Sequence, residues 1–167
     1  MDNAQALLDR LDAAEARIRQ HATREIEAGL TAPDTRTGER WDGGQLWAHI
    51  ADILPYWGEQ ARILIESYEG EPVPFGRGMD DPTRLEPIEQ HRHDVVQQHW
   101  SRLEEGADLV RSLIADADER AWTKVKGLHR LRGPMGLEEI LTSFMLNHLE
   151  EHADQLDALA GSGSSVG

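Results

Sequence analysis

Apolar residues recur at helical spacing in four stretches of the chain, which predicts four amphipathic helices separated by loops. These stretches cover residues 4 to 28, 43 to 68, 87 to 116 and 137 to 160. Gly29 and Gly161 follow the first and last stretches, and glycine commonly ends a helix. No segment shows the alternation typical of a strand. The pattern therefore predicts an all-α fold, a four-helix bundle with long loops between its helices.

The second helix has the clearest start signal in the chain. Asp42 is a good N-cap residue, and Gln45, three positions later, completes a capping box. Trp41 and Leu46 occupy the two positions of a hydrophobic staple. Further along, Pro55 lacks a backbone N–H, so we expect it to bend this helix.

Two long stretches between the helices, residues 69 to 87 and 117 to 136, show no periodicity. The first contains four prolines and three glycines. Loops of this length inside a compact domain tend to serve as lids or binding loops, so we expect both to shape a pocket. The chain has 167 residues, which predicts one domain over residues 1–160 and a flexible polar tail over residues 161–167.

Composition narrows the classes of function. The chain carries 17 basic and 31 acidic residues and a net charge of −14, which argues against binding nucleic acid. It has no apolar run of the roughly 20 residues needed to cross a membrane and no apolar leader, so we expect a cytoplasmic protein without membrane contact. Because the chain has no cysteine, protein nitrogen and oxygen must hold any metal, and any thiol must come from outside.

Three histidines stand at apolar positions of the predicted helices. His148 and His152 are four residues apart in the last helix, which places their Cβ atoms about 5 to 6 Å apart on one face. His49 lies in the second helix among apolar residues. Buried imidazoles need partners, and a divalent cation would satisfy all three. Three ligands would leave one position open, as in catalytic zinc sites.

The other histidines and the tryptophans have plainer interpretations. His99 is either a fourth ligand or a core histidine hydrogen-bonded to a carbonyl group. We expect the remaining histidines at the surface or in loops: His21, His91, His93 and His129. Among the tryptophans, Trp57 and Trp122 are the candidates for a pocket wall.

Two further features suggest chemistry. Arg130 and Arg132 belong to the basic segment KVKGLHRLR and either bind a carboxylate of a thiol or substrate or are solvated loop charges. Residues 148 to 152 also spell H-x-x-E-H, in which Glu151 would be the general base of a metal-dependent hydrolase. Only 15 residues follow His152, which leaves no room downstream for a third ligand of that kind of site.

The segments RWDGGQLWAHIADILPYW and FMLNHLEEHADQL together resemble the DinB-like, or YfiT-like, superfamily of metalloenzymes. The resemblance spans the chain from about Gln5 to Leu159 and rests on the order and placement of three histidines. It implies a four-helix bundle with an up-down-down-up arrangement, a homodimer, and a zinc or nickel ion held by His49, His148 and His152. The segment TGERWDGGQLWAHI is similar to the N-terminal domain of the mycothiol-dependent maleylpyruvate isomerase group.

The resemblance further implies an activity. Relatives activate a small-molecule thiol on the metal, which fits a chain without cysteine. The expected function is a metal-dependent transferase or isomerase that uses a low-molecular-weight thiol, such as mycothiol or bacillithiol, on an electrophilic substrate. Two alternatives remain: a non-catalytic metal- or small-ligand-binding stress-response protein, and a metal-dependent hydrolase.

Overall fold

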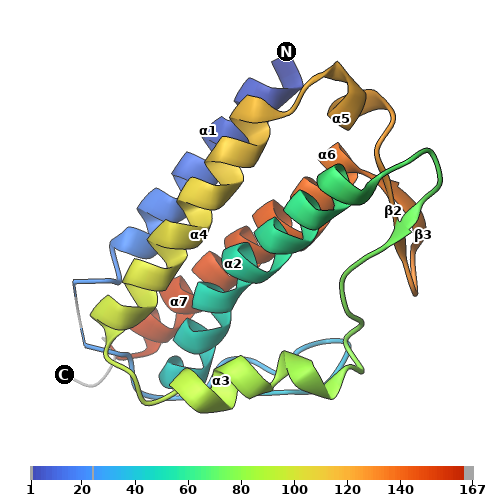
Figure 1. Cartoon of the computed structure of the whole chain (residues 1–167). Helices are drawn as coiled ribbons and strands as arrows, with labels where there is room; N and C mark the ends of the chain where they lie inside the picture. The colour runs from blue at the N-terminus through green and yellow to red at the C-terminus, as the bar shows by residue number, and fades with distance from the viewer. Residues whose placement is uncertain (1, 24, 164–167) are drawn as a thin grey trace.

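Long helical segments that lie side by side dominate the computed structural model, which describes residues 2–23 and 25–163 (Figure 1). They are α1 (Asp2–Arg19), α2 (Gly43–Ser67), α4 (Val96–Asp116), and a final helical run made of α6 (Leu137–Ile140), a π-helical segment η2 (Leu141–Leu146) and α7 (Asn147–Gly163). Helix α2 packs most extensively against α4, and α1 packs against both α4 and α7. Helices α2 and α4 run in one direction, opposite to α1 and α7 (Figure 1).

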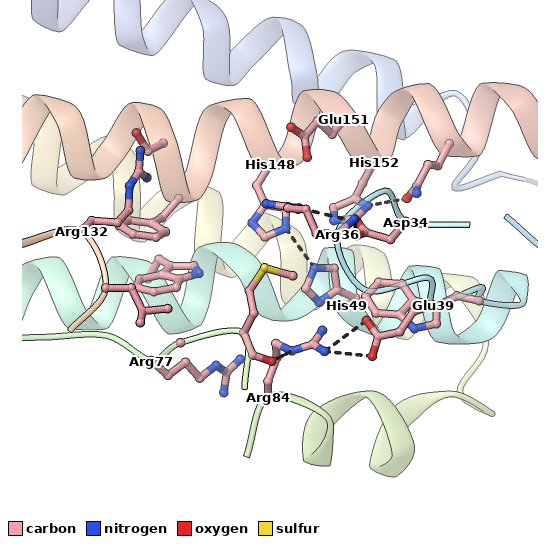
Figure 2. A pocket seen from close by; sticks show the side chains of 18 of the residues that line it. Asp34, Arg36, Glu39, His49, Arg77, Arg84, Arg132, His148, Glu151 and His152 are labelled. Carbon is pink, nitrogen blue, oxygen red and sulfur yellow. Dashed lines mark hydrogen bonds and ion pairs between the residues drawn. The ribbon is translucent and has the colours of Figure 1, made fainter. Parts of the chain in front are cut away.

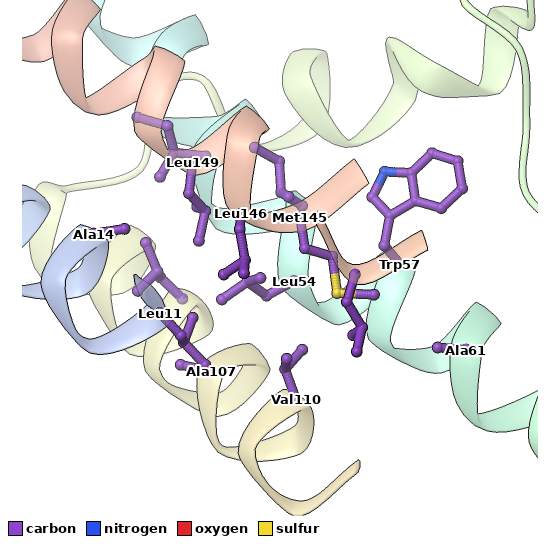
Figure 3. Close-up of a cluster of buried hydrophobic side chains, with 14 of the residues drawn as sticks. Leu11, Ala14, Leu54, Trp57, Ala61, Ala107, Val110, Met145, Leu146 and Leu149 are labelled. Atoms are coloured by element: carbon purple, nitrogen blue, oxygen red, sulfur yellow. The ribbon is translucent and has the colours of Figure 1, made fainter. Parts of the chain in front are cut away.

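The apolar faces of these segments meet in one core, where Leu11 of α1, Leu54 of α2, Val110 of α4 and Leu146 of η2 are buried (Figure 3). Glycine allows a close contact between α4 and α2. A Cβ on Gly106 of α4 would lie 2.5 Å from Pro55 Cδ of α2, a distance that real Cβ atoms essentially never show.

Helix α2 begins as the sequence predicted. The Asp42 side chain accepts a hydrogen bond from the backbone of Gln45 at 2.8 Å, and the Gln45 side chain accepts one from the Asp42 backbone at 3.0 Å. The capping box is therefore confirmed, and the helix continues through Pro55 to Ser67. This rigid start fixes the position of His49, less than two turns into the helix.

Two of the predicted helices have different boundaries. Helix α1 ends at Arg19, not at residue 28, and the chain then crosses to α2, where Ile26 packs against Gly43. The predicted third helix is broken into α3 (Glu86–His91) and α4 (Val96–Asp116). At the break, the Arg92 carbonyl lies so close to Gly44 that any larger residue at position 44 would clash. At both places the chain contacts the start of α2. The periodicity of one segment gives no information about such contacts between segments.

The fold is mostly helical, as expected, but it also contains a small sheet that the sequence did not predict. Strand β1 (Val73–Pro74) pairs in parallel with β2 (Lys126–His129), and β2 pairs antiparallel with β3 (Gly133–Gly136). These strands have two to four residues. Burial alternates along β2, but its buried positions are Gly127 and His129, so no alternation of apolar residues marks it in the sequence. Short helices also occupy the expected loops, namely η1 (Pro82–Arg84) and α5 (Glu119–Thr123). The fold is thus mostly helical, with the sheet tying the two long connections together.

The last helix extends to Gly163, so Gly161 does not end it. Residues 164–167 of the expected tail lie outside the described residues. None of the helices described is both long enough and apolar enough to cross a bilayer.

Candidate metal centre

His49 of α2 and His148 and His152 of α7 converge, as the sequence predicted (Figure 2). One ring nitrogen of each lies within 4.8 Å of the others. His49 Nε2 and His148 Nε2 are 3.4 Å apart. Two nitrogens bound to one tetrahedral zinc ion at about 2.0 to 2.1 Å would be about 3.3 to 3.4 Å apart. This pair therefore already has the spacing of two ligands of one ion.

The hydrogen bonds of the rings leave nitrogens free for an ion. His152 Nδ1 donates to Gln155 Oε1 at 2.6 Å, which orients the ring and leaves the lone pair on Nε2. His152 Nε2 is buried and has no hydrogen-bond partner among the described residues. Leaving a buried polar atom unpaired costs about 1 to 3 kcal/mol, and a metal ion would remove this penalty. His49 Nδ1 is also buried without a partner.

Desolvation keeps the three imidazoles neutral, although His148 is half-buried where His49 and His152 are buried. Desolvation is the main cause that lowers the pKa of His49 well below its usual value, and the neighbouring His152 and His148 lower it further. Desolvation and then His152 lower the pKa of His148 to about 3, and desolvation lowers the pKa of His152 to about 4. At neutral pH all three present lone pairs, the form that a metal binds.

Trp41 and the π-helical segment hold the cluster in place. The Trp41 ring lies with its centroid 4.7 Å from that of His49 and is stacked at 6.1 Å on His152. In the π-helical segment, the Asn147 N–H bonds to the Thr142 carbonyl, one residue further back than in an α-helix. Such segments often occur at functional sites, and this one lies immediately before His148.

A cavity of about 390 Å³ opens beside the three histidines, which lie on its wall. Trp57 lines it, as the sequence predicted. Trp122 does not line it and instead donates from its indole nitrogen to the Ala117 carbonyl at 3.0 Å. Glu151 is also on the cavity wall, with an exposed side chain.

Several arginines of the cavity wall were missed in the sequence, because they lie in loops without periodicity. Arg84 donates to both carboxylate oxygens of Glu39, at 2.9 and 3.1 Å, and so joins two loops beside the histidines. Arg77 donates to Asp52 at 2.9 Å and lies 3.9 Å above the Tyr56 ring. Arg36 also lines the cavity, 3.6 Å from Asp34.

The two arginines singled out in the sequence have different surroundings. Arg132 lines the cavity, and its guanidinium carbon is 5.3 Å from the centre of the Phe144 ring. Arg130 pairs with Asp80 and lines an adjacent hollow, which shares Arg77, Gly78 and His129 with the cavity. Of these two arginines, Arg132 alone lines the cavity that contains the histidines.

The other buried histidines lie outside the cluster. His99 is fully buried, as expected for a core histidine, and its Nδ1 accepts a hydrogen bond from Arg102 at 2.8 Å. His21 and His129 are buried, contrary to expectation. His21 pairs with Asp157 at 2.7 Å, and His129 Nε2 donates to the Arg77 carbonyl at 3.3 Å.

Comparisons with known proteins show the fold alone. No family model matches the chain, and no curated protein matches it. A crystal structure of an uncharacterised protein from Escherichia coli UTI89 is similar, with a TM-score of 0.70 over 96% of this chain and 94% of that one. The two sequences are 10% identical.

Proposed function

We propose that this protein is a metal-dependent transferase or isomerase that uses a low-molecular-weight thiol. The observation that carries the proposal is the meeting of His49, His148 and His152 at one point on the wall of a cavity. Their nitrogens lie within 4.8 Å of one another, and the rings are neutral at physiological pH. A structural histidine cluster would not need to face a cavity.

The donor set suits zinc or nickel. Imidazole nitrogen binds both ions well, and three protein ligands leave at least one position for a small molecule. When bound, such an ion lowers the pKa of a coordinated thiol and supplies a thiolate at neutral pH. The chain has no cysteine, so this thiol would be a separate molecule such as mycothiol or bacillithiol.

The protein's own residues would orient the reactants. Gln155 holds the His152 ring in the form that leaves Nε2 free, and Trp41 covers one side of the cluster. The ion pair between Arg84 and Glu39 joins the two segments that border the histidines.

We extend the proposal to the fold family. The helix directions, with α2 and α4 opposite to α1 and α7, support a DinB-like four-helix bundle in the up-down-down-up arrangement (Figure 1). A homodimer belongs to the same proposal. Sedimentation of the purified protein would test it, with a single 18.7 kDa species as the contrary result.

A metal-dependent hydrolase is the second candidate, because Glu151 lies on the wall of the same cavity as the histidines. In that case Glu151 would activate a water molecule, and Glu151→Gln would abolish hydrolysis while leaving thiol binding unchanged. A non-catalytic metal-binding protein would show neither effect.

Cobalt substitution tests the main proposal directly. We expect the cobalt-loaded protein to develop an intense sulfur-to-cobalt charge-transfer band on addition of mycothiol or bacillithiol, and His148→Ala to abolish the band. The serine analogue of each thiol is the matched control, since it keeps the shape and lacks the sulfur. Absence of the band with every thiol tested would overturn the thiol mechanism.

A further inference from the structure

The cavity wall away from the histidines combines an aromatic platform with an arginine. The rings of Trp57 and Phe144 stack with their centroids 4.3 Å apart and their planes 14° apart, and His129 lies against Phe144 at 5.0 Å. Arg132 lies over Phe144. In Figure 2, Arg132 and His152 are at opposite sides of the view, with His148 between them. The platform therefore lies in contact with a cation, in the same cavity as the candidate metal centre.

Arg132 differs from the other arginines of the cavity because it has no carboxylate partner among the described residues. Arg77 is paired with Asp52, Arg84 with Glu39, and Arg36 with Asp34. A guanidinium over an aromatic ring keeps its hydrogen-bond donors at the edge of its plane, where they can bind a carboxylate in bidentate fashion. The free donors of Arg132 are thus available to a ligand.

A bound divalent ion would make the cavity favour an anion. The cavity lining contains four arginines (36, 77, 84 and 132), and with Asp52, the partner of Arg77, they face four carboxylates (34, 39, 52 and 151), so the charges of the protein itself balance. The three histidines are neutral ligands, so a divalent ion would add two further positive charges without compensation. An anionic ligand would reduce this excess.

Apolar side chains at the cavity add a second requirement. Met79 and Leu131 line the cavity and remain 39% and 64% exposed. Together with the aromatic platform they form a surface that an apolar molecule would cover. Phe144 and His148 are four residues apart on one helical run, which separates them by about 6 Å along its axis. The ligand must therefore be long enough to reach from Arg132 across Phe144 to the histidines.

We propose that Arg132 and the Trp57–Phe144 platform form a subsite for an organic carboxylate with a planar apolar body. The carboxylate binds Arg132, and the apolar body lies beside the Phe144 ring and against the exposed Met79 and Leu131. The role of this molecule as the electrophile that receives the thiol rests on the proposed function. The binding itself does not, because the subsite contains none of the candidate metal ligands.

Isothermal titration calorimetry with three probes tests the subsite. The probes are 2-naphthoate, the neutral 2-naphthalenemethanol, which has the same rings, and acetate, which has the charge without the rings. We expect 2-naphthoate to bind about tenfold or more tightly than either of the others, since both halves of the subsite contribute. Arg132→Gln should weaken 2-naphthoate binding by about tenfold to a hundredfold and leave 2-naphthalenemethanol unchanged.

Arg130→Gln is the matched control, because Arg130 is two residues away and lines the other hollow. We expect its affinity for 2-naphthoate to stay within about twofold of the wild type, given that its charge is solvated. Phe144→Leu should weaken 2-naphthoate and 2-naphthalenemethanol together, since both use the ring. Equal binding of the three probes, or equal losses in the Arg132 and Arg130 variants, would overturn the proposal.

Running the titrations on metal-free and on zinc-loaded protein separates the two proposals. If no zinc binds and 2-naphthoate binding still depends on Arg132, the subsite stands and the metal centre fails. If zinc binds and 2-naphthoate does not bind to either form, the subsite fails and the metal centre stands.

Discussion

Replacing His152 with alanine should remove metal-dependent stabilisation without unfolding the protein. In the wild type, zinc at a free concentration 100 times its dissociation constant should add about 2.7 kcal/mol to the free energy of unfolding. A domain of this size gains about 2 to 4 °C in melting temperature per kcal/mol, so we expect an increase of about 5 to 11 °C. His152→Ala leaves two ligands, and the increase should disappear at the same zinc concentration.

The metal-free variant should remain folded because two effects of the substitution oppose each other. Removing the ring breaks the hydrogen bond to Gln155, which contributes about 1 kcal/mol. It also removes the buried, unpartnered Nε2, whose desolvation costs about 1 to 3 kcal/mol. The core consists of apolar residues from every long helix, so helicity by circular dichroism should not change.

His99→Ala is the control for a buried histidine outside the cluster. It removes the acceptor of a charged hydrogen bond from Arg102, which contributes about 1.5 to 3 kcal/mol. It also removes the buried Nε2 of His99, which has no hydrogen-bond partner among the described residues and whose desolvation costs about 1 to 3 kcal/mol. The stability of the metal-free protein should therefore change little. Its increase in melting temperature with zinc should match that of the wild type. Differential scanning calorimetry with and without zinc measures both quantities. A full zinc effect in His152→Ala, or its loss in a folded His99→Ala protein, would refute the assignment of the ligands.

Three further predictions concern pH, packing and helix capping. The folded-state pKa values of His148 and His152 are lowered to about 3 and about 4. The metal-free protein should therefore keep its full stability above about pH 6.5 and lose about 1.4 kcal/mol per pH unit for each histidine as the pH falls below that value. Urea unfolding at several pH values measures this loss, and a flat profile would contradict the presence of neutral, desolvated rings. Gly106→Ala should lower the free energy of unfolding by about 1 to 3 kcal/mol, because its Cβ would clash with α2. Gly161→Ala has open space around it, so it should be neutral or stabilising by up to about 1 kcal/mol. Similar denaturation midpoints for the two variants would disprove the close approach of α4 to α2. Asp42→Ala should cost about 0.5 to 2 kcal/mol through loss of the cap on α2, and a thermal melt identical to that of the wild type would show that the cap contributes nothing.

Local sequence signals were most reliable where a single helix was sufficient to explain them. The capping box at Asp42 and the C-terminal ends of α2 and α4 agree with the prediction because hydrogen bonds within the helix and its own apolar stripe determine them. The break between α3 and α4 was missed because it depends on a contact between Arg92 and Gly44, 48 positions apart in the sequence. The sheet was missed for a similar reason, since its parallel pair joins Val73 to Gly127.

The candidate metal ligands could be predicted because their spacing and apolar context are properties of the sequence. The remainder of the cavity could not. Arg77, Arg84 and Glu39 lie in loops whose paths depend on contacts with other segments, and no periodic pattern marks them. The same limit explains His129, which looked like a loop residue but is buried beneath the Arg77 carbonyl.

The sequence by itself determined that the chain forms amphipathic helices and that three histidines lie on their apolar faces, because both facts follow from the 3.6-residue period of a single helix. Only the tertiary structure decided that His49 comes within 3.4 Å of His148, 99 positions further along the chain, and that Arg132 rather than Arg130 faces the same cavity. Such distances depend on how helices and loops pack against one another, and packing of this kind is set by many weak contacts between segments remote in sequence.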